Sequence, residues 1–218
     1  MKVRWLGHSS FLFTTEKGIT VLTDPYIPGA YDGAVRYEKI KAVVDIVTVS
    51  HEHADHNGVR DLPGRPEVVR GSGDWEVKGV KIKGVSTFHD PSQGRERGSN
   101  AVFLYEMDHL RLVHLGDLGH IPEQTVVKAL GKVDILFVPV GGVYTIDARQ
   151  AAEVVKLLAP SIVIPMHFKT PKLGFNIAGV AEFLNRAPRG KELGKSEVEV
   201  KAESLPAETE TWVLLPAL

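Results

Sequence analysis

The sequence predicts an α/β domain in which strands and helices form stacked layers. Two observations predict it: the first half of the chain contains short β-rich segments joined by turns, and the second half alternates strands with helices. The length of 218 residues fits one domain of the larger kind or two small ones, and no segment has the composition of a domain linker. We therefore expect a single domain over residues 1–218.

Turn residues separate the strands of the first half. Residues 16–18 (Glu-Lys-Gly) and 107–109 (Met-Asp-His) are typical of hairpin turns, and Asp24-Pro25 ends a strand because proline has no N–H to donate. The sequence predicts a loop at residues 28–39 that forms a flap over the neighbouring part of the molecule. We expect strands at residues 3–6, 10–14, 19–23, 46–49, 79–85, 101–106 and 110–115.

Helix signals are concentrated in the second half. A proline near its start and Gly131 after its end delimit a helix at 122–130, and the capping box at 147–150 opens a helix that ends at Leu158, before a proline. A third helix is expected at 177–185 and a loop at 186–195. The remaining strands are expected at 135–138, 162–164, 197–202 and 211–215, the first two forming a βαβ unit around the second helix.

Composition excludes several classes of function. The chain has 26 Lys and Arg against 27 Asp and Glu, and this balance argues against a nucleic-acid partner, which would favour a basic excess. No segment resembles a signal peptide or a membrane span, so we expect a cytoplasmic protein with no membrane partner; a homo-oligomer stays open. Zero Cys against nine His means that any metal ligands are imidazoles and carboxylates.

The strongest chemical signal is the segment 51–56, which reads His-Glu-His-Ala-Asp-His directly after a buried strand. His51 and His53 would point the same way on an extended chain, and Asp55 and His56 would point to a neighbouring spot after a turn. Such a segment offers ligands to two metal ions. The alternative, an exposed polar loop, explains the sequence poorly, because clustered imidazoles pack badly and repel one another when protonated.

Three further residues complete two sites. His89, Asp117 and His167 each follow a predicted strand, and the carboxyl ends of strands commonly build sites in α/β sheets. We expect one ion at His51, His53 and His89, a second ion at Asp55, His56 and His167, and Asp117 as the bridge between them. Three protein ligands per ion without thiolates leave positions open for water, as in catalytic zinc sites.

This set of motifs resembles the metallo-β-lactamase superfamily, whose HxHxDH motif and later His, Asp and His occur in this order over about residues 1–170. Gly7-His8-Ser9, Asp24-Pro25, the segment 114–120 (HLGDLGH) and Pro165-Met166-His167 look closest to the branch that includes ascorbate-6-phosphate lactonase. The resemblance implies a four-layer αββα sandwich in which Asp24 supports the metal loop. It excludes the β-lactamases that use a Cys ligand.

The implied activity is hydrolysis. Two divalent cations, zinc or alternatively manganese, would hold a bridging hydroxide that attacks a small anionic ester, lactone or phosphodiester, with Asp55 as a ligand that orients it. A nuclease or cyclic-nucleotide phosphodiesterase is a second enzyme hypothesis. A non-catalytic, metal-dependent binding protein is a third, disfavoured because it would not need the whole ligand set.

Residues outside the ligand set are candidates for binding the substrate or supporting the ligands. Arg97 and Asn100 would bind an anionic group, and Lys169 would do the same; the alternative is that Arg97 and Asn100 lie in a solvated loop. Tyr144 would line the mouth of the site, or else form a turn. His8 and His120 would hydrogen-bond the ligands from outside. His109 is expected to be a turn residue and His114 a packed one.

Overall fold

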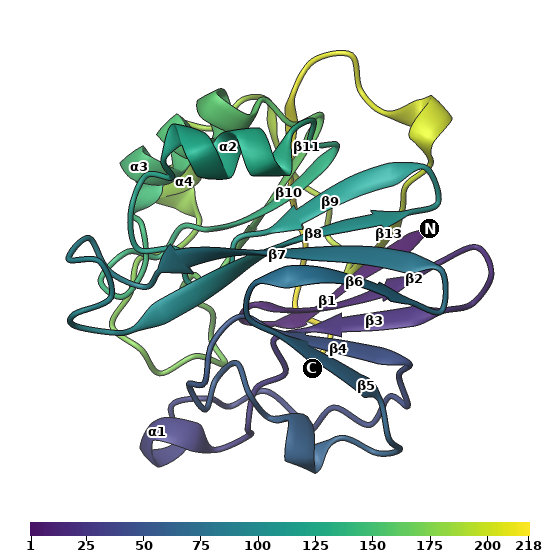
Figure 1. The fold of residues 1–218 in the computed structure, drawn as a ribbon. Helices are drawn as coiled ribbons and strands as arrows, with labels where there is room; N and C mark the ends of the chain where they lie inside the picture. Colours follow the sequence, from purple (N-terminus) through teal and green to yellow (C-terminus); the bar gives the residue numbers. More distant parts are fainter.

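The computed structural model describes residues 1–218 and consists of two mixed β-sheets packed face to face, with helices on the outside (Figure 1). This is the predicted αββα arrangement. The six-stranded sheet has the order β13-β1-β2-β3-β4-β5, with β13 Glu197–Glu199, β1 Lys2–Gly7, β2 Ser10–Thr14, β3 Thr20–Thr23, β4 Ile46–Val49 and β5 Glu67–Arg70. Strands β1, β3, β4 and β5 run in one direction, and β13 and β2 run in the other.

The larger sheet has eight strands in the order β12-β14-β11-β10-β9-β8-β7-β6. They are β12 Gly190–Glu192, β14 Glu210–Val213, β11 Ile162–Met166, β10 Ile135–Pro139, β9 Leu110–His114, β8 Ser99–Met107, β7 Val80–Phe88 and β6 Gly73–Val77. Pairing is antiparallel from β6 to β9 and parallel from β9 to β12. The parallel pair β10 and β11 encloses α3, which confirms the predicted βαβ unit.

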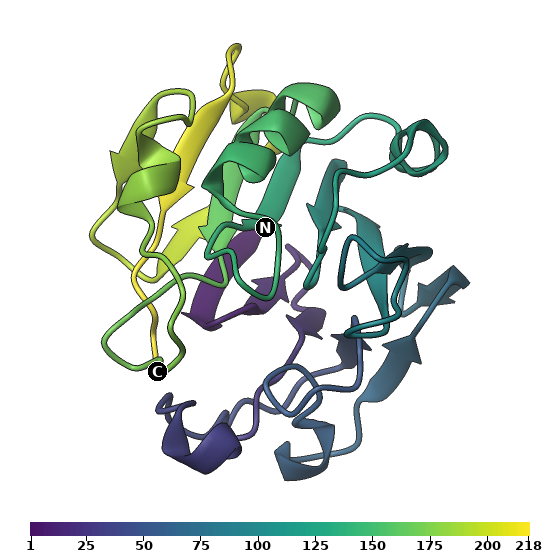
Figure 2. The same ribbon diagram turned by 90° about the vertical axis from the view of Figure 1, so that its left-hand side faces the viewer.

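Helices cover the two outer faces unequally. The helices are α1 Ala30–Gly33, α2 Gln124–Leu130, α3 Ala148–Leu158 and α4 Ala181–Leu184, with 3₁₀ turns η1 Val59–Asp61 and η2 Ala202–Ser204. Figures 1 and 2 show α2, α3 and α4 on the eight-stranded sheet and α1 on the opposite outer side. The segment 26–44 covers the six-stranded sheet, with Tyr26, Tyr37 and Ile40 in a separate apolar cluster. None of the helices has the length and hydropathy that a membrane span requires.

The core lies between the sheets and is rich in aromatic rings. Phe11 and Phe13 of β2 contact Phe137 of β10, with ring centroids 4.6 and 5.1 Å apart. Tyr105 of β8 packs edge-on against Phe13, and its hydroxyl hydrogen-bonds Thr48 Oγ1 at 2.6 Å. These contacts fix the two sheets against each other and therefore fix the loops at their ends.

Several predicted local features are confirmed. Asp147 caps α3 by accepting from the backbone N–H of Gln150, whose side chain accepts in return from the Asp147 N–H, a complete capping box. Asp108 and His109 form the two-residue turn between β8 and β9, and both have positive φ, as a type I′ hairpin turn requires.

Three predicted elements differ from the structure. The strand expected at 197–202 covers only Glu197–Glu199, and Ala202 begins a 3₁₀ turn. The helix expected at 177–185 covers only Ala181–Leu184, because the backbone N–H and C=O of Ala178 bond to Gly141 and Lys169 in neighbouring loops. The loop expected at 186–195 contains the short strand β12. Strands β5 and β6 are additional elements with no counterpart among the predicted strands.

Candidate metal centre

The predicted ligands meet because the strands that carry them end at one side of the molecule. His51 follows β4, His89 follows β7, Asp117 lies three residues beyond β9, and His167 follows β11. Strands β7, β9 and β11 run in the same direction in their sheet, so their carboxyl ends share one edge. The carboxyl end of β4 from the other sheet closes the site from the opposite layer.

Asp117 lies at the centre of this cluster. Its Oδ2 atom is 3.2 Å from the Nε2 atoms of His56, His89 and His167, and 3.7 Å from Nε2 of His51. All five side chains are buried. A single carboxylate oxygen within reach of four imidazoles is the position that a bridging ligand between two cations would occupy.

The donor atoms fall into groups with the ligand types and spacing of metal sites. Atoms within each group lie within 4.8 Å of one another, and the groups are His51, His53 and His89; His8, Asp55, His56 and His167; and His51, His56 and Asp117. The first two groups are the two sets predicted from the sequence, with His8 added to the second. Nε2 of His8 lies 3.0 Å from Oδ2 of Asp55.

Asp24 fixes the tautomers of two of these histidines. Its Oδ2 accepts from Nδ1 of His56 at 3.0 Å and from the Ser50 hydroxyl at 2.7 Å. Because the hydroxyl proton of Ser50 is directed to Asp24, Ser50 Oγ accepts from Nδ1 of His51, 2.9 Å away. With both Nδ1 atoms protonated, the Nε2 atoms carry the lone pairs and face the centre, as metal ligation requires.

Unpaired buried atoms indicate that a cation fits this cluster. Nε2 of His51, Nε2 of His56 and Oδ1 of Asp117 are buried and form no hydrogen bond. A buried polar atom without a partner costs free energy, and three of them facing one centre are explained by a ligand that accepts their lone pairs. The nitrogen and carboxylate donor set suits zinc and also admits manganese.

The electrostatics of the site differ among its residues. The Asp117 carboxylate raises the pKa of His56 and His89, although burial alone would lower it, whereas three other groups stay in the form that binds a cation. Burial, reinforced by the neighbouring histidines His56 and His167 respectively, lowers the pKa of His51 to about 3 and that of His8 to about 4. Burial alone would raise the pKa of Asp55, but His56 and His8 hold it below its ordinary range. At neutral pH, His51 and His8 are neutral and Asp55 is ionised.

Two glycines allow the loop of Asp117 to enter this crowded site. A Cβ at Gly116, where φ is +56°, would lie 2.3 Å from Oδ1 of Asn100, the atom that accepts from the Asp117 backbone N–H. A Cβ at Gly119 would lie 2.3 Å from the carbonyl carbon of His89. Only glycine at these two positions lets Asp117 reach the histidines from β4 and β7.

A cavity of about 310 Å³ opens beside the cluster. Five predicted ligands line this cavity: His53, Asp55, His89, Asp117 and His167. The other lining residues are Arg97 and Tyr144, which the sequence predicts there, and Tyr31 and Phe175, which it does not predict. Tyr31 belongs to the predicted flap at 28–39. Its hydroxyl donates to Oδ1 of Asp55 at 3.2 Å.

The loop that carries Arg97 is anchored beneath the cavity by Asp90. The buried Asp90 carboxylate accepts from the backbone N–H groups of Ser92, Gly94, Glu96 and Arg97 at 2.8 to 3.1 Å. Four donors on one carboxylate define the course of the loop. The Arg97 side chain forms an exposed ion pair with Glu96, at 3.5 Å, and its guanidinium group also lies over the Tyr144 ring.

Other candidate residues lie elsewhere. Asn100 does not reach the cavity, because its amide donates to Thr87 Oγ1 and the Leu115 carbonyl and its oxygen accepts from Asp117; it positions the ligand loop instead. The ammonium group of Lys169 donates to the Phe175 carbonyl and is outside the cavity lining.

The remaining histidines have structural contacts. Nε2 of His120 accepts from the Phe88 N–H at 3.3 Å, behind His89, so His120 supports the strand end rather than the cavity. His114 is buried and hydrogen-bonds the Ser9 carbonyl at 2.8 Å, as a packed histidine does.

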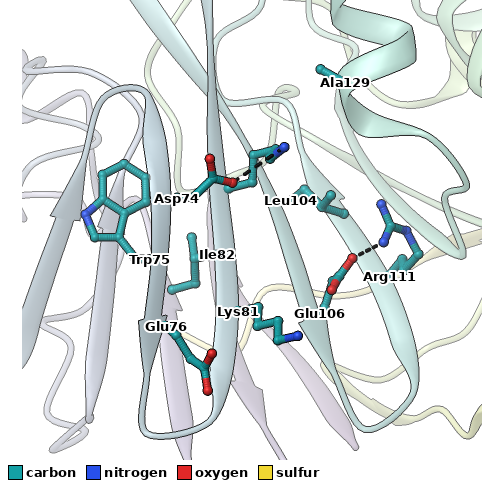
Figure 3. A pocket seen from close by; sticks show the side chains of 10 residues that line it. Asp74, Trp75, Glu76, Lys81, Ile82, Leu104, Glu106, Arg111 and Ala129 are labelled. Atoms are coloured by element: carbon teal, nitrogen blue, oxygen red, sulfur yellow. Dashed lines mark hydrogen bonds and ion pairs between the residues drawn. The ribbon is translucent and has the colours of Figure 1, made fainter.

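A larger cavity of about 480 Å³ lies over strands β6 to β9, and no cluster of metal-ligating side chains lines it (Figure 3). Its charged residues pair with each other, Asp74 with Lys83 and Glu106 with Arg111. Its lining contains neither histidine nor any of the buried unpaired atoms. The smaller cavity beside Asp117 is therefore the candidate active site.

Comparison with known proteins identifies the family of the chain. Residues 2–167 match the beta-lactamase superfamily domain. A UPF0173 metal-dependent hydrolase of Thermococcus onnurineus (strain NA1) is 31% identical over 195 residues, which cover 78% of this chain and 85% of that protein.

Solved structures agree as well. A protein of Thermotoga maritima, described as a candidate Zn-dependent hydrolase of the metallo-β-lactamase superfamily, is 37% identical with a TM-score of 0.79, covering 98% of this chain and 97% of its own. YhfI of Bacillus subtilis, a metallo-β-lactamase fold protein, has a TM-score of 0.63, and the match covers 100% of this chain and 98% of YhfI. At 12% identity, this similarity shows a common fold only. The chain thus belongs to the UPF0173 metal-dependent hydrolases of the metallo-β-lactamase superfamily.

Proposed function

We propose that the protein hydrolyses a small anionic ester, lactone or phosphodiester at a dinuclear metal centre. The convergence of four imidazoles on Oδ2 of Asp117, next to a cavity that also contains an arginine, is the observation that carries this proposal. The cavity volume is at the lower end of the range for ligand pockets, which supports a small substrate.

Seven residues would hold the two ions. His51, His53 and His89 would bind the first, Asp55, His56 and His167 the second, and Asp117 both; zinc is the expected metal and manganese the alternative. Cations bound there would supply Lewis acidity, which lowers the pKa of water and polarises the oxygen of the scissile group.

The chain's own residues would then orient the reactants. Asp55 lines the cavity with an ionised carboxylate, and its proposed role is to accept a hydrogen bond from the attacking water. Arg97, held in place through Asp90, would bind the anionic group of the substrate. Tyr144 and Phe175 also line the cavity.

A phosphorylated lactone is one member of this substrate class, and the resemblance of the motifs to ascorbate-6-phosphate lactonase favours it. A cyclic nucleotide or another small phosphodiester is the second candidate, supported by the same arginine. The near-neutral net charge of −1 and the small cavity disfavour long nucleic acids.

The test is a substrate panel with metal analysis. The zinc-loaded and manganese-loaded proteins are assayed with bis-p-nitrophenyl phosphate, lactones and thioesters. A His56→Ala variant is assayed beside them, and Trp75→Leu, a substitution in the larger cavity over strands β6 to β9, is the control. We expect turnover of at least one ester class, about two ions per chain in the wild type and in Trp75→Leu, and loss of one ion in His56→Ala. No turnover by the loaded wild type, or unchanged metal content in His56→Ala, would refute the proposal.

A further inference from the structure

Three aromatic side chains form a continuous wall of the candidate active site. The ring of Phe175 packs edge-to-face between Tyr31 and Tyr144, with centroid distances of 5.4 and 5.8 Å and interplanar angles of 70° and 65°. All three residues line the cavity. They come from three separate segments, namely α1, the loop after β10 and the loop after β11. We refer to Tyr31, Phe175 and Tyr144 as the aromatic arc.

The arc extends from the predicted metal ligands to the guanidinium group of Arg97. At one end, the Tyr31 hydroxyl donates to Asp55, and the Phe175 ring lies 5.9 Å from the ring of His8. At the other end, the guanidinium carbon of Arg97 lies 5.9 Å from the centroid of the Tyr144 ring. Asp55, the three aromatic rings and the positive charge of Arg97 therefore border one cavity.

The two tyrosines of the arc are not buried, and packing of the core does not explain their positions, whereas the half-buried Phe175 packs against the apolar cluster that contains Tyr26 and Tyr37. Tyr31 is 47% exposed and Tyr144 is 40% exposed. Tyr31 has a φ of 54°, and Val143, which precedes Tyr144, has a φ of 64°. Positive φ is unfavourable for bulky and β-branched residues, and such strain is concentrated where a fold holds ligands.

We infer that the aromatic arc binds an aryl group of the substrate while Arg97 binds an anionic substituent beyond the ring. The inference rests on the proposed function, since it places the scissile group of the same substrate at the metal centre. Aromatic rings present faces and edges to a planar group, and the arginine provides the complementary charge at the far end. The cavity of about 310 Å³ suits a small substrate, and an aryl ester or aryl phosphodiester of that size would meet both requirements.

Binding of three phosphonates to the zinc-loaded full chain tests this inference by calorimetry. Phenylphosphonate and methylphosphonate differ only in the ring, and 4-phosphonobenzoate adds a carboxylate opposite the phosphonate. We expect phenylphosphonate to bind about tenfold more tightly than methylphosphonate, and 4-phosphonobenzoate several-fold more tightly again. Phe175→Leu and Tyr144→Leu should each reduce the phenyl preference to about twofold or threefold, and Arg97→Gln should remove only the advantage of 4-phosphonobenzoate.

A matched control and the opposing outcomes complete the test. Trp75→Leu, an aromatic-to-leucine change in the other cavity, should leave the phenyl preference intact. Equal affinity for phenylphosphonate and methylphosphonate, a preference that survives both arc variants, or no binding of any phosphonate at millimolar concentration would overturn the inference. Turnover without phenyl preference refutes the arc alone, whereas phenyl preference without turnover of any panel substrate refutes the proposed hydrolysis alone.

Discussion

Asp24 illustrates how a residue outside the cavity can determine the chemistry inside it. Its carboxylate accepts a hydrogen bond from His56 directly, and it orients His51 through the hydroxyl of Ser50. An asparagine at this position would present an N–H₂ group where Oδ2 now accepts two bonds. His56 would then have to accept at Nδ1, and its proton would move to Nε2, the atom that faces the predicted metal.

We therefore expect Asp24→Asn to lower metal affinity about 10-fold to 100-fold. Ser50→Ala should lower it less, because it interrupts only the branch to His51 and leaves the bond between Asp24 and His56. Competition with a chromophoric chelator measures both affinities, and circular dichroism of the metal-free proteins checks their folding. Equal losses in the two variants would contradict the two-branch arrangement.

Val143 offers a test of strain at the rim of the site. Its side chain is 63% exposed and its φ is 64°, and the Tyr144 N–H bonds back to the Gly142 carbonyl at 2.7 Å. Glycine accepts this backbone conformation without a Cβ clash. We expect Val143→Gly to raise the free energy of unfolding by about 1 kcal/mol, measured by urea denaturation. A destabilised variant would show that the exposed side chain contributes packing that outweighs the strain.

At the residue scale, the sequence revealed the residues that stand in a compact motif and missed those that do not. Four of the predicted ligands lie within residues 51–56, so their clustering is visible without a fold. Tyr31 and Phe175 have no spacing signal, because three unrelated loops bring the arc together. Asn100 was placed wrongly since the direction of a side chain at the start of a strand depends on what covers the strand.

At the scale of elements, the missed strands are those at sheet edges. β5, β6 and β12 are edge strands of their sheets. All three residues of β12 are exposed, and β5 buries only Val69. An edge strand that buries one side chain or none has no apolar alternation to recognise. The central strands β4, β10 and β11 are buried at every position and were predicted correctly from continuous apolar runs.

Asp45 links elements of both sheets and predicts a pH dependence. Its carboxylate accepts from the Thr20 backbone N–H and hydroxyl at the start of β3, and it pairs with Lys78 in the β6–β7 turn. Lys78 and then Thr20 lower the pKa of Asp45. Because the folded pKa is depressed, the stabilisation is present above the unfolded pKa of about 3.9 and is lost as the pH falls towards the folded pKa.

We expect Asp45→Asn to destabilise the protein by about 0.5 kcal/mol at neutral pH, since the exposed ion pair with Lys78 is screened by solvent. This deficit should shrink as the pH falls from about 5 to about 2. Urea unfolding of the metal-free wild type and variant across this range measures it. A deficit that stays constant with pH would mean that the charge of Asp45 contributes nothing.

At the scale of the whole molecule, metal removal should weaken the fold, because the two sheets meet at the ligands. A cation would satisfy buried atoms of His51, His56 and Asp117 that are otherwise unpaired. At a free metal concentration of 100 times its dissociation constant, binding adds about 2.7 kcal/mol to the free energy of unfolding.

For a chain of this size, we expect chelation to lower the unfolding midpoint by about 5–10 °C. Calorimetry of the zinc-loaded protein before and after treatment with EDTA measures the shift. The same treatment of Asp117→Ala should produce a smaller one. An unchanged midpoint in the wild type would contradict a metal site that joins the sheets.

The last strands of the chain have a consequence for its synthesis. β13 supplies the edge partner of β1, and the amino group of Met1 donates to the Val200 carbonyl, 199 positions away. A ribosome releases β1 long before β13, and closing so long a loop delays folding. During that interval the edge of β1 is open to other chains, so the nascent protein should need chaperones most just before β13 emerges.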